Sequence, residues 1–369
     1  MLIGIDGNEA NIAKRVGIGE YAFELLRQFE KFKISNLKFQ IYLKAMPLEH
    51  MPKEREGWKY QVIGPSKIWT QFALPLVLFS ERAFRLRTQP SIFFSPSHYA
   101  PRFSPVPTAI SIMDLSFIHF PELFTKHDLY QLTNWTKYSA KNAKKIFTIS
   151  NFSRDDIIKT YGKDPKDVVT TYLGIKQELN MEELKKKFDI DGKYILFVGT
   201  LQPRKNIAKL IEAFSKIKDK EIKLVIVGKK GWLWEEIAQA PEKYHVVERV
   251  KFLDFVEDED LPSLYKNATC FVLPSLYEGF GLPVLEAMQY GCPVLISNVS
   301  SLPEVGGDAA LYFDPTNADE ITKKIDQVIS DEKLRNEMVE KGKIQVKKFS
   351  WEKTAKETLK VLEELGNER

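Results

Sequence analysis

Short apolar segments alternate with amphipathic ones through most of the chain. Near its start, "LIGID" precedes "IGEYAFELLRQFEKF", whose apolar residues recur at the spacing of a helix. The apolar segments "LKFQIYLK", "SIFFSP", "TAISIM" and "KKIFTIS" follow, each bounded by turn residues and separated by helix-like stretches. This alternation of strand and helix signals predicts an α/β fold for the first half of the chain.

The same alternation restarts after a charged stretch, residues 175–193 ("IKQELNMEELKKKFDIDGK"), which we interpret as a connector. Beyond it lie "YILFVGT", "IKLVIVG", "TCFVLP" and "CPVLIS", again with helical segments between them. Such short, continuously apolar strands are typical of parallel sheets covered by helices on both faces. We therefore predict two α/β domains with a cleft between them, and we expect ligands at the carboxyl ends of their strands.

Length and composition agree with two globular domains. The chain has 369 residues, more than one ordinary core holds, with 44% apolar and 28% charged residues. Its net charge of +4 is unevenly spread, because residues 1–176 carry an excess of Lys and Arg and the remainder an excess of Asp and Glu. A basic half indicates an anionic partner, which can be a nucleic acid, an anionic membrane surface or a phosphorylated substrate. Scattered surface lysines are the alternative.

Several features bear on the cellular compartment. Cys270 and Cys292 each lie in an apolar segment, so we expect small buried side chains and a reducing compartment. The first residues lack the basic-then-apolar pattern of a secretory signal. The most apolar segment stays uncharged over only 13 residues, Ile68 to Ser80, too short to span a bilayer. These features predict a cytoplasmic protein whose membrane contact is at most peripheral.

Two glutamates flank a glycine-rich turn in "SLYEGFGLPVLEAMQY". The turn follows a predicted strand, and Pro283 suits the first turn of a helix. Amides at a helix start, beside glycines that permit close approach, form an anion site. Glu278 precedes this site, and Glu286 lies within it or one turn further on. The two carboxylates would be roughly 12 Å apart if the intervening residues were helical. A nucleotide sugar fits this pattern, with hydroxyls at both ends and a diphosphate between them; a loop charge and a solvated helix residue are the alternative.

A second loop between a strand and a helix carries adjacent cations. In "FVGTLQPRKNIAKLIEAF" these are Arg204 and Lys205. Arginine offers a planar fork and lysine a point charge, a combination that suits a diphosphate. A solvated surface pair is the alternative for any two adjacent cations, but two complementary loops in one domain favour the diphosphate.

These segments resemble a known enzyme family. "PRKN", "SLYEGFGLPVLEAMQYGCPVLISNVSSLPEVGGDAALYFDP" and "FSWEKTAKETLKVLEEL" are similar to segments of family-4 retaining glycosyltransferases of the GT-B fold, nearest in pattern to a bacterial branch enriched in mannosyltransferases. The resemblance covers almost the whole chain and is most specific from Glu278 to Pro315, where the motif E-x7-E is complete. It implies two Rossmann-like domains facing a central cleft: residues 1–175 with the C-terminal helix 350–369 for the acceptor, and residues 176–349 for the donor.

The resemblance also implies a role for each residue of the glutamate loop. Glu278 is expected to face the donor sugar, with the amides of Phe280, Gly281 and Leu282 lining the sugar and the phosphate. Glu286 is expected to hold the ribose.

The cation loop and the first half receive roles in the same way. Arg204 and Lys205 are expected to bind the diphosphate. "RVGIGEY" resembles the family's glycine loop, in which Gly17 and Gly19 approach the donor phosphate and the reacting centre. The spacing Gly17-x-Gly19-x-x-Ala22 also matches a dinucleotide fingerprint, but about ten residues separate it from the first strand, too many for the tight Rossmann turn.

"SIMDLSFIHFPELF" resembles a family segment usually written His-Asp-Leu. Asp114 and Leu115 are kept, whereas Met113 occupies the position where histidine is common. We therefore expect Asp114 to organise the acceptor hydroxyl, with capping of a helix after a strand as the alternative. His98 and His119 are further candidates for acceptor activation.

Two acidic pairs have the spacing of the metal-binding pair in the other main glycosyltransferase fold. They are "DID" (Asp189 and Asp191) and "DED" (Asp258 and Asp260), and we interpret them as turn and helix-start charges. Because the cation loop already offers positive charge to a leaving diphosphate, we expect neither a divalent metal nor another cofactor.

The sequence thus predicts a retaining hexosyltransferase of cell-surface polysaccharide synthesis. We expect it to move mannose from GDP-mannose to a hydroxyl of a glycan or lipid-linked acceptor. A hydrolase or epimerase of nucleotide sugars would share the fold. Nucleic acid is not expected as a partner, because the dense basic cluster "SAKNAKKIF" has no stacking residues beside it.

An anionic membrane surface is a further expected partner. "KIWTQFALPLVLFSERAFRLR" mixes apolar and aromatic residues with arginines, as an interfacial helix does. It predicts peripheral docking on the inner face of the membrane. The alternative is that Trp69, Phe72 and Leu76 belong to the core of the domain.

Overall fold

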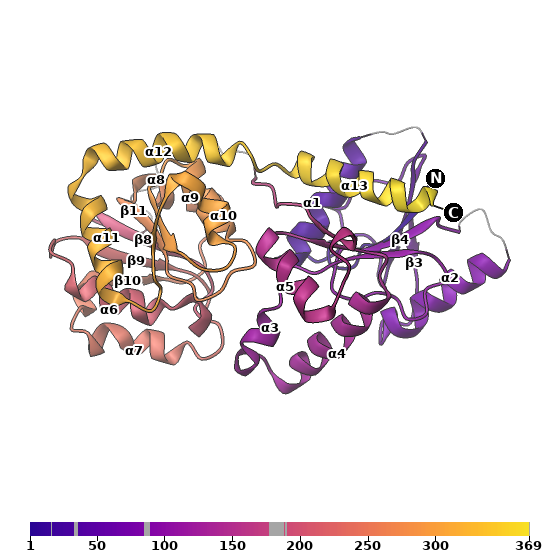
Figure 1. Cartoon of the computed structure of the whole chain (residues 1–369), viewed down its shortest axis with the longest axis horizontal. Coiled ribbons are helices and arrows are strands. Elements are labelled where there is room, and N and C mark those ends of the chain that lie inside the picture. Colours follow the sequence, from indigo (N-terminus) through magenta and orange to yellow (C-terminus); the bar gives the residue numbers. More distant parts are fainter. Residues whose placement is uncertain (16, 33–35, 85–88, 177–187, 189, 369) are drawn as a thin grey trace. The chain divides into compact units, whose positions relative to one another are not determined.

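The computed structural model describes the chain except for residues 16, 33–35, 85–88, 177–187, 189 and 369. The chain divides into two compact units (Figure 1). Unit 1 comprises Met1–His119, Phe124–Gly174 and Ser350–Arg369, and unit 2 comprises Phe120–Leu123 and Ile175–Phe349. The main change of unit, between Gly174 and Ile175, lies beside the domain boundary indicated by the sequence.

The described part of unit 1 contains a parallel sheet of seven strands. They are β1 (Leu2–Asp6), β2 (Lys38–Leu43), β3 (Trp58–Val62), β4 (Ile92–Ser95), β5 (Thr108–Ser111), β6 (Lys145–Thr148) and β7 (Val168–Thr170). Their spatial order is β3-β2-β1-β4-β5-β6-β7, and neighbouring strands run parallel, with Ile3 of β1 opposite both Phe39 and Ile92. The order reverses between β1 and β4, which makes this point the topological switch of a doubly wound sheet.

The helices of unit 1 lie between these strands and at the end of the chain. They are α1 (Ile18–Lys31), the π-helix η1 (Trp69–Ala73), α2 (Leu74–Ala83), α3 (Ser116–His119), α4 (Lys126–Asn142), α5 (Asn151–Tyr161), the 3₁₀ turn η3 (Pro165–Asp167) and α13 (Trp351–Asn367). The side chains of Thr125, Ser150 and Ser350 cap α4, α5 and α13 by accepting a backbone N–H of the first turn.

Helix α13 packs against the rest of unit 1, which is far from it in sequence. The hydroxyl of Thr354 donates to the carbonyl of Tyr172, and the rings of Trp351 and Tyr21 lie 6.4 Å apart. A Cβ added to Gly174 would lie 2.0 Å from the amide nitrogen of Trp351. The crossing of the chain at this point therefore requires a glycine.

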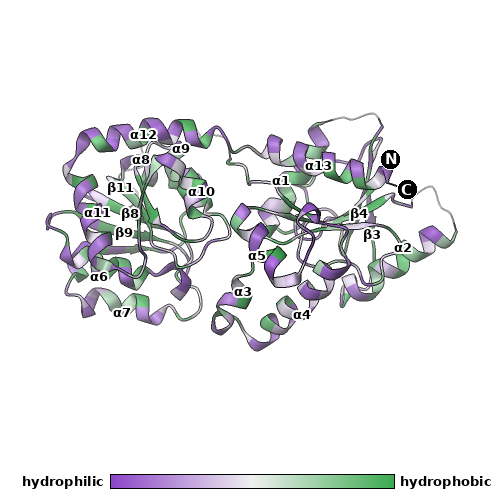
Figure 2. Cartoon of the chain, viewed as in Figure 1, coloured by the Kyte–Doolittle hydropathy of each residue, from purple (hydrophilic) through white to green (hydrophobic). Residues whose placement is uncertain are grey.

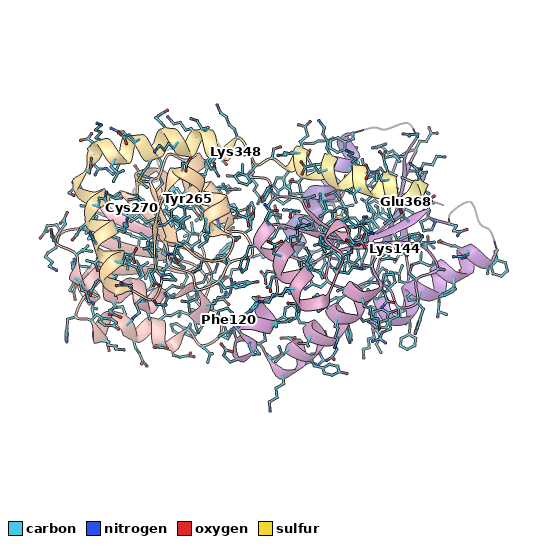
Figure 3. All side chains as sticks on the ribbon, viewed as in Figure 1. Phe120, Lys144, Tyr265, Cys270, Lys348 and Glu368 are labelled. Carbon is cyan, nitrogen blue, oxygen red and sulfur yellow. The ribbon has the colours of Figure 1, made fainter. Side chains whose placement is uncertain are left out.

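The described part of unit 2 contains a second parallel sheet, of six strands. They are β8 (Tyr194–Val198), β9 (Lys223–Val227), β10 (Val250–Leu253), β11 (Cys270–Leu273), β12 (Val294–Ser297) and β13 (Ala310–Phe313), in the order β10-β9-β8-β11-β12-β13. Every residue of β8, β11 and β12 is buried, as predicted for strands covered on both faces. The prediction that Cys270 and Cys292 are buried is also confirmed, and neither forms a disulfide (Cys270 is labelled in Figure 3).

The helices of unit 2 alternate with these strands. They are η2 (Pro121–Leu123), η5 (Pro203–Lys205), α6 (Ile207–Lys216), α7 (Glu235–Lys243), η6 (Val247–Arg249), α8 (Leu261–Asn267), α9 (Leu282–Gln289), α10 (Leu302–Gly306), η7 (Gly307–Ala309), α11 (Ala318–Ser330) and α12 (Glu332–Val346). In Figure 2 hydrophilic and hydrophobic residues alternate along α12 and α13, as expected of surface helices. Among the described residues, no helix is both long and apolar enough to cross a bilayer. The predicted α/β class is confirmed.

Candidate active site

In unit 2 the strand order reverses between β8 and β11, so the loops after these two strands lie at the switch point of the sheet. The loop after β8 leads into η5, which carries Arg204 and Lys205. The loop after β11 leads into α9 and carries Glu278. The two loops that the sequence analysis singled out are therefore neighbours at one edge of one sheet.

Backbone and amide hydrogen bonds join these two loops. The Nδ2 of Asn206 donates to the carbonyls of Pro274 at 3.1 Å and Pro315 at 2.8 Å. The amide of Leu276 donates to the carbonyl of Arg204 at 2.9 Å. Asn206 has a left-handed backbone with φ of 57°, a conformation that asparagine tolerates better than most residues. The sequence analysis missed Asn206, although its place between the cation pair and a helix was a usable signal.

A cluster of charged side chains surrounds Glu278, which is only 6% exposed. The Nζ of Lys205 donates to its Oε1 at 2.5 Å, and the hydroxyl of Ser275 donates to the same oxygen at 2.6 Å. The Nη1 of Arg204 lies 3.5 Å from Oε2 and donates to the carbonyl of Tyr277 at 2.5 Å. Two cations and a hydroxyl thus compensate for the burial of one carboxylate.

The surroundings of Glu278 also decide its protonation. Burial raises the pKa of Glu278, but attraction to Lys205 and Arg204, with the hydrogen bonds from Lys205 and Ser275, outweighs burial and holds the pKa below its ordinary value. The carboxylate is therefore ionised at neutral pH and accepts hydrogen bonds. Three residues that the sequence assigned to one donor site are in contact in the structure.

A third loop, after β12, holds the backbone of Glu278. The amide of Glu278 donates to the hydroxyl of Ser300 at 2.9 Å. The hydroxyl of Ser301 donates to the carbonyls of Glu278 at 2.9 Å and Phe280 at 3.0 Å. The sequence analysis missed both serines, because nothing in "NVSSLPEV" shows which loop they face.

The turn before α9 requires a glycine. Gly281 has a φ of 105°, and a Cβ there would lie 2.8 Å from the Cδ2 of Leu302. The ring of Phe280 is buried edge-on against Phe349, with centroids 5.7 Å apart. Leu282 begins α9, Pro283 has no amide hydrogen, and the amide of Val284 donates to the carbonyl of Gly281 at 2.9 Å. The contact of the amides of Phe280, Gly281 and Leu282 with the donor stays a prediction.

Glu286 lies inside α9 and is held by a tyrosine. The hydroxyl of Tyr265, from α8 (labelled in Figure 3), donates to Oε2 of Glu286 at 2.9 Å, and the ring of Tyr265 stacks on that of Tyr290. Burial raises the pKa of Glu286, and the hydrogen bond from Tyr265 lowers it. The charge of Asp258 raises the pKa further and that of Lys176 lowers it. Together they leave the pKa of Glu286 above its ordinary value. The sequence analysis missed Tyr265. Ribose binding by Glu286 stays a prediction.

The two glycines of "RVGIGEY" lie in unit 1, at the start of α1. Gly17 precedes the helix with a φ of 52°, and a Cβ there would meet no described atom within 4 Å, so only its backbone angle favours glycine. Gly19 lies in the first turn, where a Cβ would stand 2.9 Å from the carbonyl of Glu9. Gly19 therefore packs the helix start onto the loop after β1. Their approach to the donor phosphate stays a prediction.

Asp114 follows β5 and caps a short helix. Its Oδ1 accepts the amide of Ser116 at 2.8 Å, at the start of α3, so the capping alternative describes its observed contact. The amide of Met113 donates to the Nε2 of His98 at 3.2 Å, which places the hydrogen of a neutral His98 on Nδ1. Burial lowers the pKa of His98 to about 4, with the charge of Asp114 acting in the opposite direction. The structure thus places a neutral imidazole beside Asp114, although Met113 occupies the usual histidine position.

The remaining candidates have other partners. The Nε2 of His119 lies 2.7 Å from Oδ2 of Asp156. Asp258 of the pair "DED" contacts Lys176 at 2.8 Å, and Asp189 of "DID" lies outside the described residues. Within the described ranges, no group of three or more His, Cys, Asp or Glu is arranged to hold a metal ion.

Known proteins match this chain over nearly its whole length. The family model "Glycosyl transferases group 1" matches residues 180–345. The O-antigen chain mannosyltransferase B of Escherichia coli is 32% identical over 364 residues, which cover 93% of this chain and 94% of that protein. The chain belongs to the group 1 glycosyltransferases. A second relative of this glycosyltransferase, the O-antigen chain mannosyltransferase RfbU of Salmonella typhimurium, is 28% identical over 206 residues, 56% of each chain.

Solved structures share the fold of this glycosyltransferase. Sucrose-phosphate synthase from Thermosynechococcus elongatus matches with a TM-score of 0.76 and 17% identity, over 99% of this chain and 98% of that one. Anabaena HepE in complex with UDP-glucose matches with a TM-score of 0.74 and 17% identity, over 98% of this chain and 99% of that one. The glycosyltransferase has the GT-B fold, is a hexosyltransferase and lies in the mannosyltransferase-like branch, as the sequence predicted.

Proposed function

We propose that this glycosyltransferase transfers mannose from GDP-mannose to a hydroxyl of a glycan or lipid-linked acceptor in cell-surface polysaccharide synthesis, with retention of the anomeric configuration. The observation that carries the proposal is the cluster of Arg204, Lys205 and Glu278 at the switch point of unit 2. Mannose and the polysaccharide are supported by the names of the Escherichia coli and Salmonella relatives. The structural neighbours, at 17% identity, support the fold alone.

The two cations suit the leaving group. The bond between the anomeric carbon and the diphosphate breaks while the acceptor oxygen forms a bond to that carbon. Negative charge accumulates on the departing GDP, which takes up the proton of the acceptor hydroxyl. Charge that develops during the reaction is stabilised best by groups already fixed in place. Lys205 is held by Glu278, and Arg204 by the carbonyl of Tyr277, so both cations are in position before the donor arrives. With the amides at the start of α9 they supply the positive charge, and we propose catalysis without a divalent metal.

Glu278 suits the sugar end of the donor. Its lowered pKa keeps it ionised, so it accepts hydrogen bonds from sugar hydroxyls and does not donate a proton. A carboxylate has about four acceptor sites, so Oε2 of Glu278, with Arg204 at 3.5 Å, can also accept a sugar hydroxyl while both cations stay in place. We assign no protein nucleophile, and Asp114 is the residue proposed to orient the acceptor hydroxyl.

Glu286 suits the ribose. Tyr265 occupies Oε2 of Glu286, which leaves Oε1 to accept a ribose hydroxyl. We propose that the enzyme acts in the cytoplasm. There it is bound peripherally to the inner face of the membrane, where a lipid-linked acceptor presents its sugar.

A panel of nucleotide sugars tests this function. GDP-mannose is expected to raise the Tm of the purified chain more than GDP-fucose, UDP-glucose or UDP-galactose, because only a donor that binds the native state stabilises it. A double variant, Arg204→Ala with Lys205→Ala, is expected to lose the shift. A larger shift with another donor would overturn the assignment of GDP-mannose.

Product analysis separates transfer from hydrolysis. GDP release is expected to depend on an acceptor glycan, and the product is expected to carry an α-mannosyl linkage by NMR. Equal GDP release with and without acceptor would identify a hydrolase instead. A β-linked product would overturn retention.

A further inference from the structure

The outer face of η1 and α2 in unit 1 is apolar and exposed. Ile68, Phe72, Leu76 and Phe79 follow one another at helical spacing, and Phe72 and Leu76 are 63% and 68% exposed. Figure 2 shows hydrophobic residues along α2. Single exposed apolar residues are ordinary, whereas a row of large ones along a helix marks an interaction site.

The inner face of the same segment already forms the core. Trp69, Leu74 and Leu78 are buried in a cluster with Tyr42 and Phe93 of the sheet. The alternative that Trp69, Phe72 and Leu76 belong to the core is therefore right for Trp69 and wrong for Phe72 and Leu76. Because packing of unit 1 does not need the outer residues, folding alone does not explain them.

A neighbouring loop extends the apolar face. The amide of Arg102 donates to the carbonyl of Thr70 in η1 at 3.1 Å, and Arg82 of α2 donates to the carbonyl of Pro105. Between these two contacts, Phe103 has a φ of 52° and is 73% exposed. We call Ile68, Phe72, Leu76, Phe79 and Phe103 the apolar face.

The chain segment that carries the apolar face has exposed charges of one sign. From Gln61 to Ile110 the sequence contains a single acidic residue, Glu81. Glu81 is buried and accepts the hydroxyl of Tyr42 at 2.9 Å, so it offers no charge to the surface. Lys67 and Arg82 are exposed, and Arg102 is partly exposed. The face therefore presents apolar side chains bordered by cations.

We propose that the apolar face docks on an anionic lipid leaflet, with the aromatic and aliphatic side chains in the acyl boundary and the cations against phosphate headgroups. A second copy of this chain fits less well. A two-fold interface sets the same patch against itself, which would bring cations together without a carboxylate from this segment to pair with them. The inference rests on the proposed function, because a lipid-linked acceptor would lie at this leaflet.

Vesicle binding tests the proposal on the full chain. Sedimentation is compared for vesicles of phosphatidylcholine alone and vesicles of equal parts phosphatidylcholine and phosphatidylglycerol, at low and high salt. The chain is expected to pellet with the anionic vesicles at low salt and at least tenfold less in the other three conditions, because salt screens exposed charges.

Surface variants locate the face. Phe72→Ser with Leu76→Ser, and separately Lys67→Glu, are expected to reduce vesicle binding at least tenfold with an unchanged Tm, since all three side chains are exposed. Ile344→Ser and Lys333→Glu remove an exposed apolar side chain and an exposed cation from α12 of unit 2. These matched controls are expected to bind like the parent chain.

Failure of this inference and failure of the proposed function give different results. Equal pelleting in all four conditions, or equal loss in the α12 controls, would overturn the docking face even if mannose is transferred to a water-soluble acceptor. Concentration-dependent dimerisation that Phe72→Ser with Leu76→Ser abolishes would place a second copy on the face and overturn the lipid. Vesicle binding without any mannose transfer would overturn the proposed function and leave the face standing.

Discussion

The ammonium group of Lys205 contacts the carboxylate of Glu278 at 2.5 Å, and the two residues are 9% and 6% exposed. Removing one partner of a buried pair leaves the other charge without compensation, which typically costs about 3–5 kcal/mol. Here Arg204 also lies near Glu278, so it would offset part of that cost. A test of Lys205 must therefore separate its part in the reaction from its part in stability.

Lys205→Ala is expected to lower kcat roughly 100-fold or more, the effect of removing one donor to a developing negative charge. It is also expected to lower the free energy of unfolding. Lys205→Met with Glu278→Gln removes both charges and should recover much of that stability but no activity. Urea unfolding and steady-state kinetics with GDP-mannose measure the two effects.

Lys209→Ala is the control for Lys205, since Lys209 pairs with Glu212 on the surface of α6. Such a surface pair is worth less than about 0.5 kcal/mol. If Lys205→Ala and Lys209→Ala both keep kcat within about twofold of the parent chain, Lys205 has no part in the transfer.

Stability is expected to fall in acid partly because of Glu278. The pKa of Glu278 in the folded chain lies below the ordinary value of a carboxyl group. Its contribution to the free energy of unfolding is therefore complete above that ordinary value and is lost as the pH falls through the pKa of the folded chain. Glu278→Gln leaves Lys205 without its counterion and should be less stable than the parent at pH 7. Its urea midpoint should also decline less between pH 6 and the acid limit of folding. Parallel curves for the two proteins would contradict this assignment.

The fold and the centre of the site were predictable because their signals are local. Continuously apolar runs of four or five residues identify buried parallel strands, and β8 and β11 are such runs. Arg204, Lys205 and Glu278 each lie a few residues after one of these strands. Their positions therefore follow from the position of the switch point in the sheet.

The partners that hold these groups were not predictable, because they come from distant parts of the chain. Ser301 reaches Glu278 from the loop after β12, and Tyr265 reaches Glu286 from α8. In the segment of η1 and α2, most residues are apolar. Its periodicity cannot show that Trp69 is buried and Phe72 exposed; only the packing of the sheet beneath decides this.

Glu286→Ala is expected to raise the donor KM roughly tenfold or more, with kcat nearly unchanged. The proposed ribose contact is far from the reacting carbon, and a hydrogen bond to a charged group contributes about 1.5–3 kcal/mol. Tyr265→Phe keeps the stacked ring but loses the bond to Glu286, so a smaller rise in KM is expected. An unchanged KM in Glu286→Ala would exclude the ribose assignment.

Tyr244→Phe is the control for Tyr265. The hydroxyl of Tyr244 also donates to a glutamate, Glu212, in the same unit, but at 3.3 Å and away from α9. A similar KM for this variant and the parent is expected. A rise equal to that of Tyr265→Phe would show that loss of any such tyrosine bond perturbs the unit.

Chelation is expected to leave the rate almost intact. We propose that Arg204 and Lys205, which lie together at Glu278, supply the positive charge that a metal would otherwise bring to the diphosphate. The parent chain is assayed with GDP-mannose before and after dialysis against EDTA. Complete loss of activity that Mg²⁺ or Mn²⁺ restores would contradict metal-independent transfer.

Asp114 can be tested apart from its capping contact. Asparagine keeps an Oδ1 that accepts the amide of Ser116, so Asp114→Asn preserves the cap of α3 and removes only the charge. We expect its kcat to fall at least tenfold with an unchanged Tm, if the carboxylate orients the acceptor hydroxyl. Asp114→Ala loses the cap as well and should also lose about 0.5–2 kcal/mol of stability.

His98→Gln completes this comparison, because a glutamine side chain can still accept the amide of Met113 as the Nε2 of His98 does. The pKa of His98, about 4, keeps its imidazole neutral across the working pH range, so it cannot supply a titration near neutral pH. The pH profile of kcat/KM between pH 5 and 8 should therefore have the same shape in His98→Gln as in the parent. An acidic limb that disappears in His98→Gln would show that His98 accepts the proton of the acceptor hydroxyl. Full activity in Asp114→Asn would leave Asp114 as a helix cap alone.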